Sequence, residues 1–183
     1  DPNLINYLKE FKKIKVNNES TRIHLKGLLI GPVIVNLFMN KLAMISEDHD
    51  LILSKKVNSS NKNFIYDLFN TLKFFKSDNK LNEEGLFFCK RSSAYGVTVS
   101  YMPLFSKINY LLFDDSTKLL NRDKNGNELH VNRKMNVWGS GGAHKLYFKK
   151  IDEIIINIFN RPIELQPKGI ADMGCGDGTM LIH

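Results

Sequence analysis

Three glycines alternate with other residues near the end of the sequence, in the run Asp172-Met173-Gly174-Cys175-Gly176-Asp177-Gly178. Glycine lets a backbone turn tightly and approach a ligand closely, because it carries no Cβ atom. The small apolar segment 169–171 precedes the run and predicts a short strand. The turn would then lie at the carboxyl edge of a parallel sheet, where such sheets hold their ligands. A purely structural glycine turn is the alternative.

The spacing of these glycines differs from the dinucleotide-binding pattern G-x-G-x-x-G, because Gly178 comes one residue too early for it. The acidic Asp172 would also repel a phosphate group. A carboxylate at the end of a strand suits a cationic amino acid group, whose ammonium it can hold directly or through water. The residues therefore favour a ligand with an amino acid moiety over a pyrophosphate.

Apolar residues at helical spacing predict a mainly α-helical chain in front of this turn. The predicted helices cover residues 1–14, 23–45, 64–75, 104–113 and 145–159. Gly31-Pro32 is expected to bend or divide the second of them. The aromatic-rich stripe of the third is interpreted as core.

The remaining segments are predicted to be loops or strands. Residues 54–63 are polar and predict a loop. In the segment 95–101, Val97, Val99 and Tyr101 alternate, which favours a strand, with a helix as the alternative. The polar stretch 114–136, with its turn signal at 123–127, predicts a hairpin tip or an exposed connection. We place the domain boundary there.

Composition limits the compartment and the partners. The formal net charge is +7, and 21 of the 26 basic residues are Lys. Because these basic residues are scattered along the sequence, we expect a solvated basic surface rather than a nucleic-acid site. Cys89 and Cys175 are expected to be free thiols in a reducing compartment. The apolar stretch 27–39 is interrupted and shorter than the roughly 20 residues of a membrane span. We expect a cytoplasmic protein.

The glycine run resembles motif I of class I methyltransferases, in which the acidic residue and the glycines contact the methionine part of S-adenosylmethionine. Here these residues are Asp172, Gly174, Gly176 and Gly178. The longer run from Asn136 to Thr179, which includes Val137-Trp138-Gly139-Ser140-Gly141-Gly142-Ala143-His144, resembles the C-methyltransferase domains of modular polyketide synthases, of the metal-dependent apratoxin starter-unit type. Leu81-Asn82-Glu83-Glu84-Gly85 and the segment 94–103 are similar to the winged-helix front domains of small-molecule methyltransferases.

The resemblance implies a helical lid domain, with a winged-helix arrangement as an alternative, over residues 1–135. The first helix, strand and turn of a Rossmann-like core would follow over residues 136–183. The sequence begins without Met and ends five residues after Gly178, whereas a class I core needs on the order of a hundred further residues. We therefore expect a truncated fragment that neither holds S-adenosylmethionine tightly nor catalyses methyl transfer alone.

Several other residues are candidates for this site. Gly141 and Gly142 are expected in a loop before a helix, where backbone N–H groups could bind the carboxylate of the cofactor. A hinge between lid and core is the alternative for the same glycines. Trp138 is interpreted as packing rather than stacking on a ligand. His144 and His183 are candidate ligands for a mononuclear iron or manganese in a metal-dependent relative, although their spacing shows no metal motif.

The resemblance implies methyl transfer from S-adenosylmethionine to a carbon atom of a thioester on an acyl carrier protein. The expected partners are that carrier protein and neighbouring synthase domains, without a membrane. The catalytic residues are not identifiable from this sequence. The alternatives are a small-molecule O-methyltransferase with a winged-helix front domain, and a non-catalytic module that binds a carrier protein or DNA.

Overall fold

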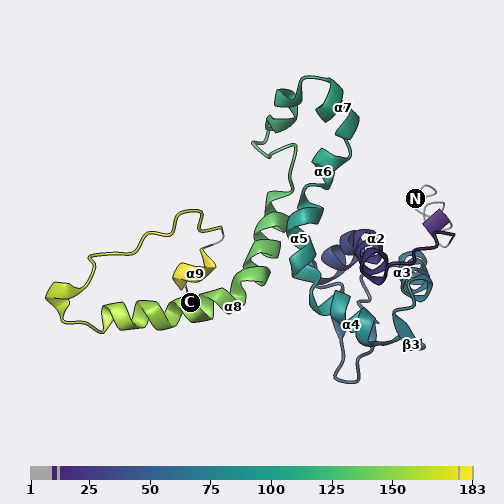
Figure 1. Ribbon diagram of the computed structural model, residues 1–183, viewed down its shortest axis with the longest axis horizontal. Coiled ribbons are helices and arrows are strands. Elements are labelled where there is room, and N and C mark those ends of the chain that lie inside the picture. Colours follow the sequence, from purple (N-terminus) through teal and green to yellow (C-terminus); the bar gives the residue numbers. More distant parts are fainter. Residues whose placement is uncertain (1–9, 12, 177, 183) are drawn as a thin grey trace. The chain divides into compact units, whose positions relative to one another are not determined.

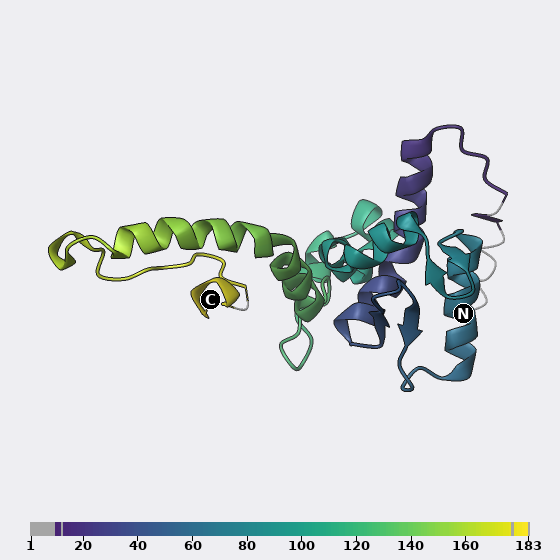
Figure 2. The ribbon, with the colours of Figure 1, turned by 90° about the horizontal axis from the view of Figure 1, so that it is seen from below.

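The computed structural model describes residues 10, 11, 13–176 and 178–182 of the chain. It divides into two compact units, Asp1–Tyr95 and Gly96–His183 (Figure 1 and Figure 2). Helices dominate the described residues and the strands are short, so the prediction of a mainly α-helical fold is confirmed. The helix predicted over residues 1–14 lies mostly outside the described residues. The predicted domain boundary after residue 135 lies elsewhere than the division between these units, and it stays a prediction.

The first unit contains, over its described residues from 13 on, three helices and two short hairpins, and it ends in the start of the helix α5 (Ser92–Ser100). In chain order the elements are α2 (Glu19–Met39), β1 (Ala43–Ile45), β2 (Leu51–Leu53), α3 (Ser59–Thr71), β3 (Phe75–Ser77), β4 (Lys80–Leu81) and α4 (Glu83–Lys90). An asparagine begins each of α2, α3 and α4. The side chains of Asn18, Asn58 and Asn82 accept hydrogen bonds from N–H groups of the first helical turns, as helix caps do.

Two helices end at a lysine in the left-handed conformation. Lys41 has φ 53° and Lys73 has φ 58°. The N–H of Leu42 donates to the carbonyl of Leu37 at 2.7 Å, and the N–H of Phe74 donates to that of Phe69 at 2.9 Å. These are the bonds of a helix end that is usually made by glycine. For this reason α2 and α3 end earlier than residues 45 and 75, where the apolar pattern placed their ends.

The other predicted boundaries in this unit also change. The α2 helix starts at Glu19 rather than residue 23, and it contains Pro32 without being divided. The α3 helix starts at Ser59, inside the predicted loop 54–63, because Asn58 caps it. Residues 95–100 belong to the helix α5, so of the two alternatives for the segment 95–101 the structure shows the helix, and the favoured strand does not form.

The two hairpins are antiparallel, with Ala43 opposite Leu53 in the first and Phe75 opposite Leu81 in the second. A bridge between Asp50 and Lys80 connects them. The second hairpin precedes α4 directly. It follows α3 in the chain, and its two strands β3 and β4 form a short wing.

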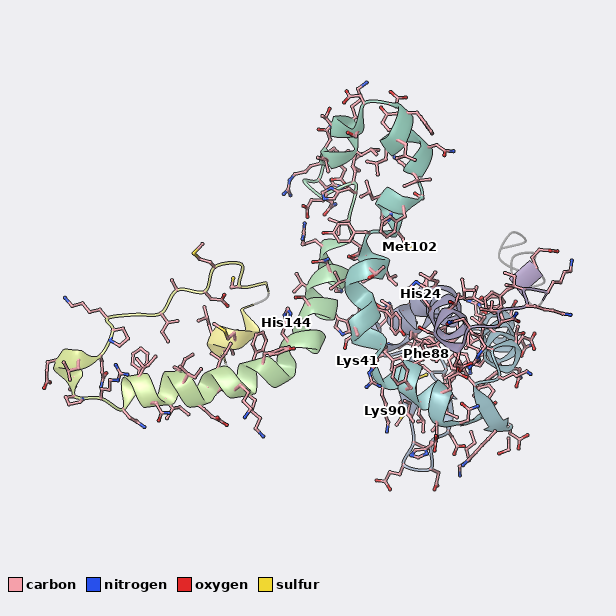
Figure 3. All side chains as sticks on the ribbon, in the orientation of Figure 1. His24, Lys41, Phe88, Lys90, Met102 and His144 are labelled. Atoms are coloured by element: carbon pink, nitrogen blue, oxygen red, sulfur yellow. The ribbon has the colours of Figure 1, made fainter. Side chains whose placement is uncertain are left out.

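The core of this unit is aromatic. The rings of Phe74 and Phe88 stack with centroids 5.0 Å apart, and Phe69 meets Phe74 edge-on at 5.7 Å. All three side chains are fully buried (Figure 3 labels Phe88). Most of the aromatic-rich stripe of α3 packs here, which confirms its interpretation as core.

The helix α2 is long and apolar enough to cross a membrane by length and composition, with a mean hydropathy of 1.4. Its Ile30 and Ile34 are fully buried in the core of the unit. Lys26 of the same helix is 6% exposed and its Nζ lies 2.7 Å from Oε2 of Glu84 in α4. Packing against α4 and the hairpins therefore accounts for the apolar composition of α2.

The second unit is built on one long helix. Its elements are the end of α5, then α6 (Met102–Phe105), α7 (Ile108–Phe113), the 3-10 turn η1 (Ser116–Leu120), α8 (Arg133–Phe159), the 3-10 turn η2 (Ile163–Leu165) and α9 (Thr179–Ile182). The helix predicted over 104–113 is thus two short helices. A bridge between Arg122 and Glu128 closes the turn at 123–127, so the hairpin tip is the alternative that the structure shows for that stretch.

Candidate functional site

The glycine turn forms as the sequence predicts. Gly174, Gly176 and Gly178 have φ values of 83°, 61° and 76°, a region that side chains other than glycine enter only with strain. The N–H of Gly178 donates to the carbonyl of Cys175 at 2.8 Å. The helix α9 begins at Thr179, directly after the last glycine. The three glycines are therefore required by the backbone conformation of the turn.

The turn leaves space beside its backbone. A Cβ atom added to Gly174 would meet no atom within 4 Å, and one added to Gly176 would meet only Cγ1 of Val137 at 3.9 Å. Gly174 and Gly176 are exposed, and Asp172 in front of them is half-buried. The exposed backbone of Gly174 and Gly176 therefore lies close in sequence to the half-buried carboxylate of Asp172. Val137 places the start of α8 next to this turn.

The strand predicted over 169–171 does not form among the described residues. Residues 166–172 have no regular secondary structure, and Ile170 is 47% exposed. A strand of a parallel sheet needs neighbours for its backbone hydrogen bonds, and no described segment of this unit supplies one. The prediction was therefore wrong for this chain.

The glycines at 139–142 lie inside α8 and not in a loop in front of it. The helix begins at Asn132, whose side chain accepts a hydrogen bond from the N–H of Met135 at 3.0 Å. The N–H groups of Gly141 and Gly142 are therefore in a helix interior, and the helix N-terminus expected beside them does not exist. In Figure 1 the ribbon of α8 changes direction part way along, which glycine pairs permit. Contact of Gly141 and Gly142 with a cofactor stays a prediction.

Gly139 has a packing role that the sequence did not reveal. A Cβ atom on Gly139 would lie 2.6 Å from the backbone nitrogen of Val97, and one on Gly96 would lie 2.8 Å from Cα of Gly139. The two backbones touch where α5 and α8 cross. The signal in the sequence is the pair of small residues Gly96 and Ser100, four positions apart on one helix face.

Polar groups complete this crossing. The Oγ of Ser100, which is fully buried, accepts a hydrogen bond from Nδ2 of Asn136 at 3.0 Å and donates to the carbonyl of Val97. The ring of Trp138 would lie 3.1 Å from a Cβ atom on Gly96. Trp138 therefore packs over Gly96, as the sequence analysis interpreted it.

The structure describes one of the two histidine candidates, His144. His144 is exposed, its Nδ1 lies 3.3 Å from Oγ of Ser140, and its ring contacts those of Tyr147 and Phe148 on the same helix (Figure 3). His183 lies outside the described residues. Within the part of the chain that the structure describes, no group of three metal-binding side chains occurs, and an iron or manganese ion stays a prediction.

The two cysteines are free and differ in reactivity. Cys89 is 2% exposed in the core of the first unit, and burial raises the pKa of its thiol to about 12. Cys175 lies exposed in the glycine turn. A thiol reacts as its thiolate, and burial keeps the Cys89 thiol protonated and covered. A reagent in solution can therefore reach Cys175 more easily than Cys89.

Comparison with protein families gives two matches, which together cover most of the chain. They show a winged helix domain followed by a methyltransferase domain, a class of enzyme that generally uses S-adenosylmethionine. Residues 26–115 match the AprA winged helix domain, and residues 128–183 match the AprA MT2-like domain. No curated protein matches the chain.

The chain therefore combines the AprA-type winged helix with the start of the AprA-type methyltransferase domain. The resemblance to the apratoxin type is confirmed, and of the two descriptions of the N-terminal domain the winged helix is the one that applies. The match over 26–115 contains α3 and the wing of β3 and β4.

Proposed function

We propose that this chain is the winged helix and cofactor-turn region of a C-methyltransferase that acts on an acyl thioester carried by an acyl carrier protein. The observation that carries the proposal is the turn at 172–178, where three glycines adopt positive φ beside a half-buried carboxylate. The AprA-type matches over both units support the same class of enzyme.

The residues of the turn would hold the methionine end of the cofactor. Asp172 would bind its ammonium, and Gly174, Gly176 and Gly178 would let the backbone approach it. Bound S-adenosylmethionine supplies an electrophilic methyl group on a sulfonium. Methyl transfer is an in-line displacement, so the contribution of this chain is to orient the cofactor. We derive no step through a metal ion.

We expect the chain alone to be inactive. A class I core binds its cofactor across the edge of a parallel sheet, and the described residues after 128 contain no named strand. These described residues therefore provide no sheet edge for the adenosine end of the cofactor. Titration of the chain with S-adenosylmethionine is expected to give no measurable heat, and micromolar binding would contradict this expectation.

The charge of the chain supports an acidic partner. Its net charge of +7 would attract a carrier protein of opposite charge and speed encounter. Neighbouring synthase domains would lie in the same cytoplasmic assembly. DNA fits less well, because α3, the helix in front of the wing, carries Lys62 as its one basic residue and also carries Asp67.

A winged helix in front of a methyltransferase also suits a small-molecule O-methyltransferase, which would use a general base to activate a hydroxyl. The AprA-type matches favour the carbon acceptor. A non-catalytic module that binds a carrier protein is the remaining alternative, and the open glycine turn argues against it because such a module has no use for a cofactor cradle.

Methyl transfer is the test. The chain, extended by the rest of a methyltransferase core, is incubated with isotopically labelled S-adenosylmethionine, an acyl carrier protein that bears a short acyl thioester, and a small phenol as a competing acceptor. We expect one labelled methyl group on the acyl chain, retained as a carbon branch after alkaline release of the acid. Label on a phenol and not on the acyl chain would support the O-methyltransferase, and no transfer to either would contradict both.

A further inference from the structure

An open pocket in the second unit is lined by basic side chains from two segments. Its volume is about 570 Å³, and it lies between the turn at 122–128 and the start of α8. Arg122 comes from the turn, and Arg133 and Lys134 come from the first turn of the helix. Glu128 is the acidic residue of the lining. The pocket therefore has an excess of positive charge.

The turn that carries Arg122 is rigidly built. The carboxylate of Asp123 accepts hydrogen bonds from the N–H groups of Asn125 and Asn127, both at 2.8 Å. These bonds, together with one from the side chain of Asn127 as the main cause, lower the pKa of Asp123. Nη1 of Arg122 donates to the carbonyl of Gly126 at 2.8 Å. The carboxylate of Asp123 thus accepts its hydrogen bonds from the turn itself. The bond to Gly126 holds Arg122 in the lining of the pocket.

The second arginine is oriented by the carboxylate. Nε and Nη2 of Arg133 donate to the two oxygens of Glu128, each at 2.7 Å. This pair, as the main cause, lowers the pKa of Glu128 and raises that of Arg133. A guanidinium has five N–H donors, so Arg133 keeps donors free after this pair. The side chain of Lys134 is exposed and makes no hydrogen bond or ion pair with another described residue.

We propose that this pocket binds a phosphate group that belongs to a larger organic molecule. Guanidinium groups suit phosphate oxygens because their donors form a planar fork, and here two of them and an ammonium line one pocket. A phosphate group carries more negative charge than a carboxylate and can offer a separate oxygen to each of the three cations. The volume far exceeds that of a phosphate ion, so room is left for the organic part.

This inference does not depend on methyl transfer. The pocket belongs to the turn and the start of α8, and its residues are separate from those of the glycine turn. A phosphopantetheine arm is one source of such a group, and a free phosphate metabolite is another. Both present the same chemistry to the three cations.

Binding is measured by calorimetric titration of the whole chain in a buffer without phosphate or sulfate. The probes are inorganic phosphate, 4′-phosphopantetheine and, as a carboxylate control, acetate. We expect saturable binding of inorganic phosphate and 4′-phosphopantetheine, and none of acetate. Tighter binding of 4′-phosphopantetheine than of inorganic phosphate would identify the arm as the source, and equal binding would identify the phosphate alone.

Lys134→Ala is the diagnostic variant, because this side chain is exposed and its loss should leave the fold intact. We expect the affinity for phosphate to fall about fivefold, and Lys134→Arg to retain it. Lys150→Ala is the matched control, since Lys150 is an exposed lysine of the same helix outside the pocket. Equal weakening by both alanine variants, equal binding of acetate, or no binding of phosphate would overturn the proposal.

Discussion

Replacing Gly139 by alanine tests the crossing of α5 and α8. The new Cβ atom would lie 2.6 Å from the nitrogen of Val97 and 2.8 Å from both Cα and the carbonyl carbon of Gly96. These are backbone atoms, so no side-chain rotation relieves the clash. Overpacking of this kind costs up to about 3 kcal/mol, whereas alanine favours the helix interior over glycine by about 1 kcal/mol. The net expected loss in the free energy of unfolding is about 2 kcal/mol.

Trp138 is the single tryptophan of the chain and lies at this crossing, so its fluorescence reports unfolding of the second unit. With an m-value of about 1–2 kcal/mol/M, the urea midpoint of Gly139→Ala should fall by about 1–2 M. Far-UV circular dichroism provides a second probe.

Gly142→Ala is the matched control for this experiment. Gly142 lies in the same helix and is exposed, so through helix propensity alone the alanine is expected to raise the free energy of unfolding by up to about 1 kcal/mol, and the urea midpoint with it. The two variants therefore change stability in opposite directions. A midpoint for Gly139→Ala at or above that of the parent chain would refute the close backbone contact.

The first unit provides three further predictions. Asn82→Ala should destabilise it by about 1–2 kcal/mol in urea unfolding, because its side chain both caps Gly85 and donates to the carbonyl of Lys73 at 2.7 Å; an unchanged midpoint would contradict this role. Lys73→Gly should instead stabilise it by up to about 1 kcal/mol, since glycine adopts the positive φ of that position without strain. In the native chain at pH 8, a thiol reagent should label Cys175 rapidly and Cys89 only after unfolding. Burial raises the pKa of Cys89 to about 12, so its thiol stays protonated at pH 8. Labelling of both at equal rates would show that Cys89 is not in the core.

The glycine turn could be predicted from the sequence because its requirement is local. A backbone that must reach positive φ three times in five residues leaves glycine as the natural choice, and Gly174, Gly176 and Gly178 all do so. The caps at Asn18, Asn58 and Asn82 are equally local. They were missed because each precedes a polar first turn, where apolar spacing gives no signal.

Features that depend on distant segments could not be predicted in this way. The alternation of Val97, Val99 and Tyr101 is typical of a strand, but the close contact of Gly96 with Gly139 and the hydrogen bond from Asn136 to Ser100 fix this segment against α8 as a helix. The segment 169–171 has a composition suited to a strand, yet a strand forms only beside partners.

The positions of Gly141 and Gly142 depend on where α8 begins. Asn132 caps the helix early, and the helix then continues through glycines that, on propensity alone, predict a loop. Packing of Gly139 against Gly96 compensates for that low propensity. The same contact explains why a glycine-rich stretch can be helical here.

Binding of S-adenosylmethionine to this chain extended by the rest of a methyltransferase core, with Asp172 intact or replaced by asparagine, tests the central claim most directly. The asparagine keeps the shape of the side chain and removes the charge that would hold the ammonium of the cofactor. We predict micromolar binding by calorimetry for the parent protein and at least a tenfold weaker affinity, or about 1.4 kcal/mol, for Asp172→Asn. Equal affinity of the two proteins would contradict the assignment of the turn at 172–178 to the methionine end of the cofactor.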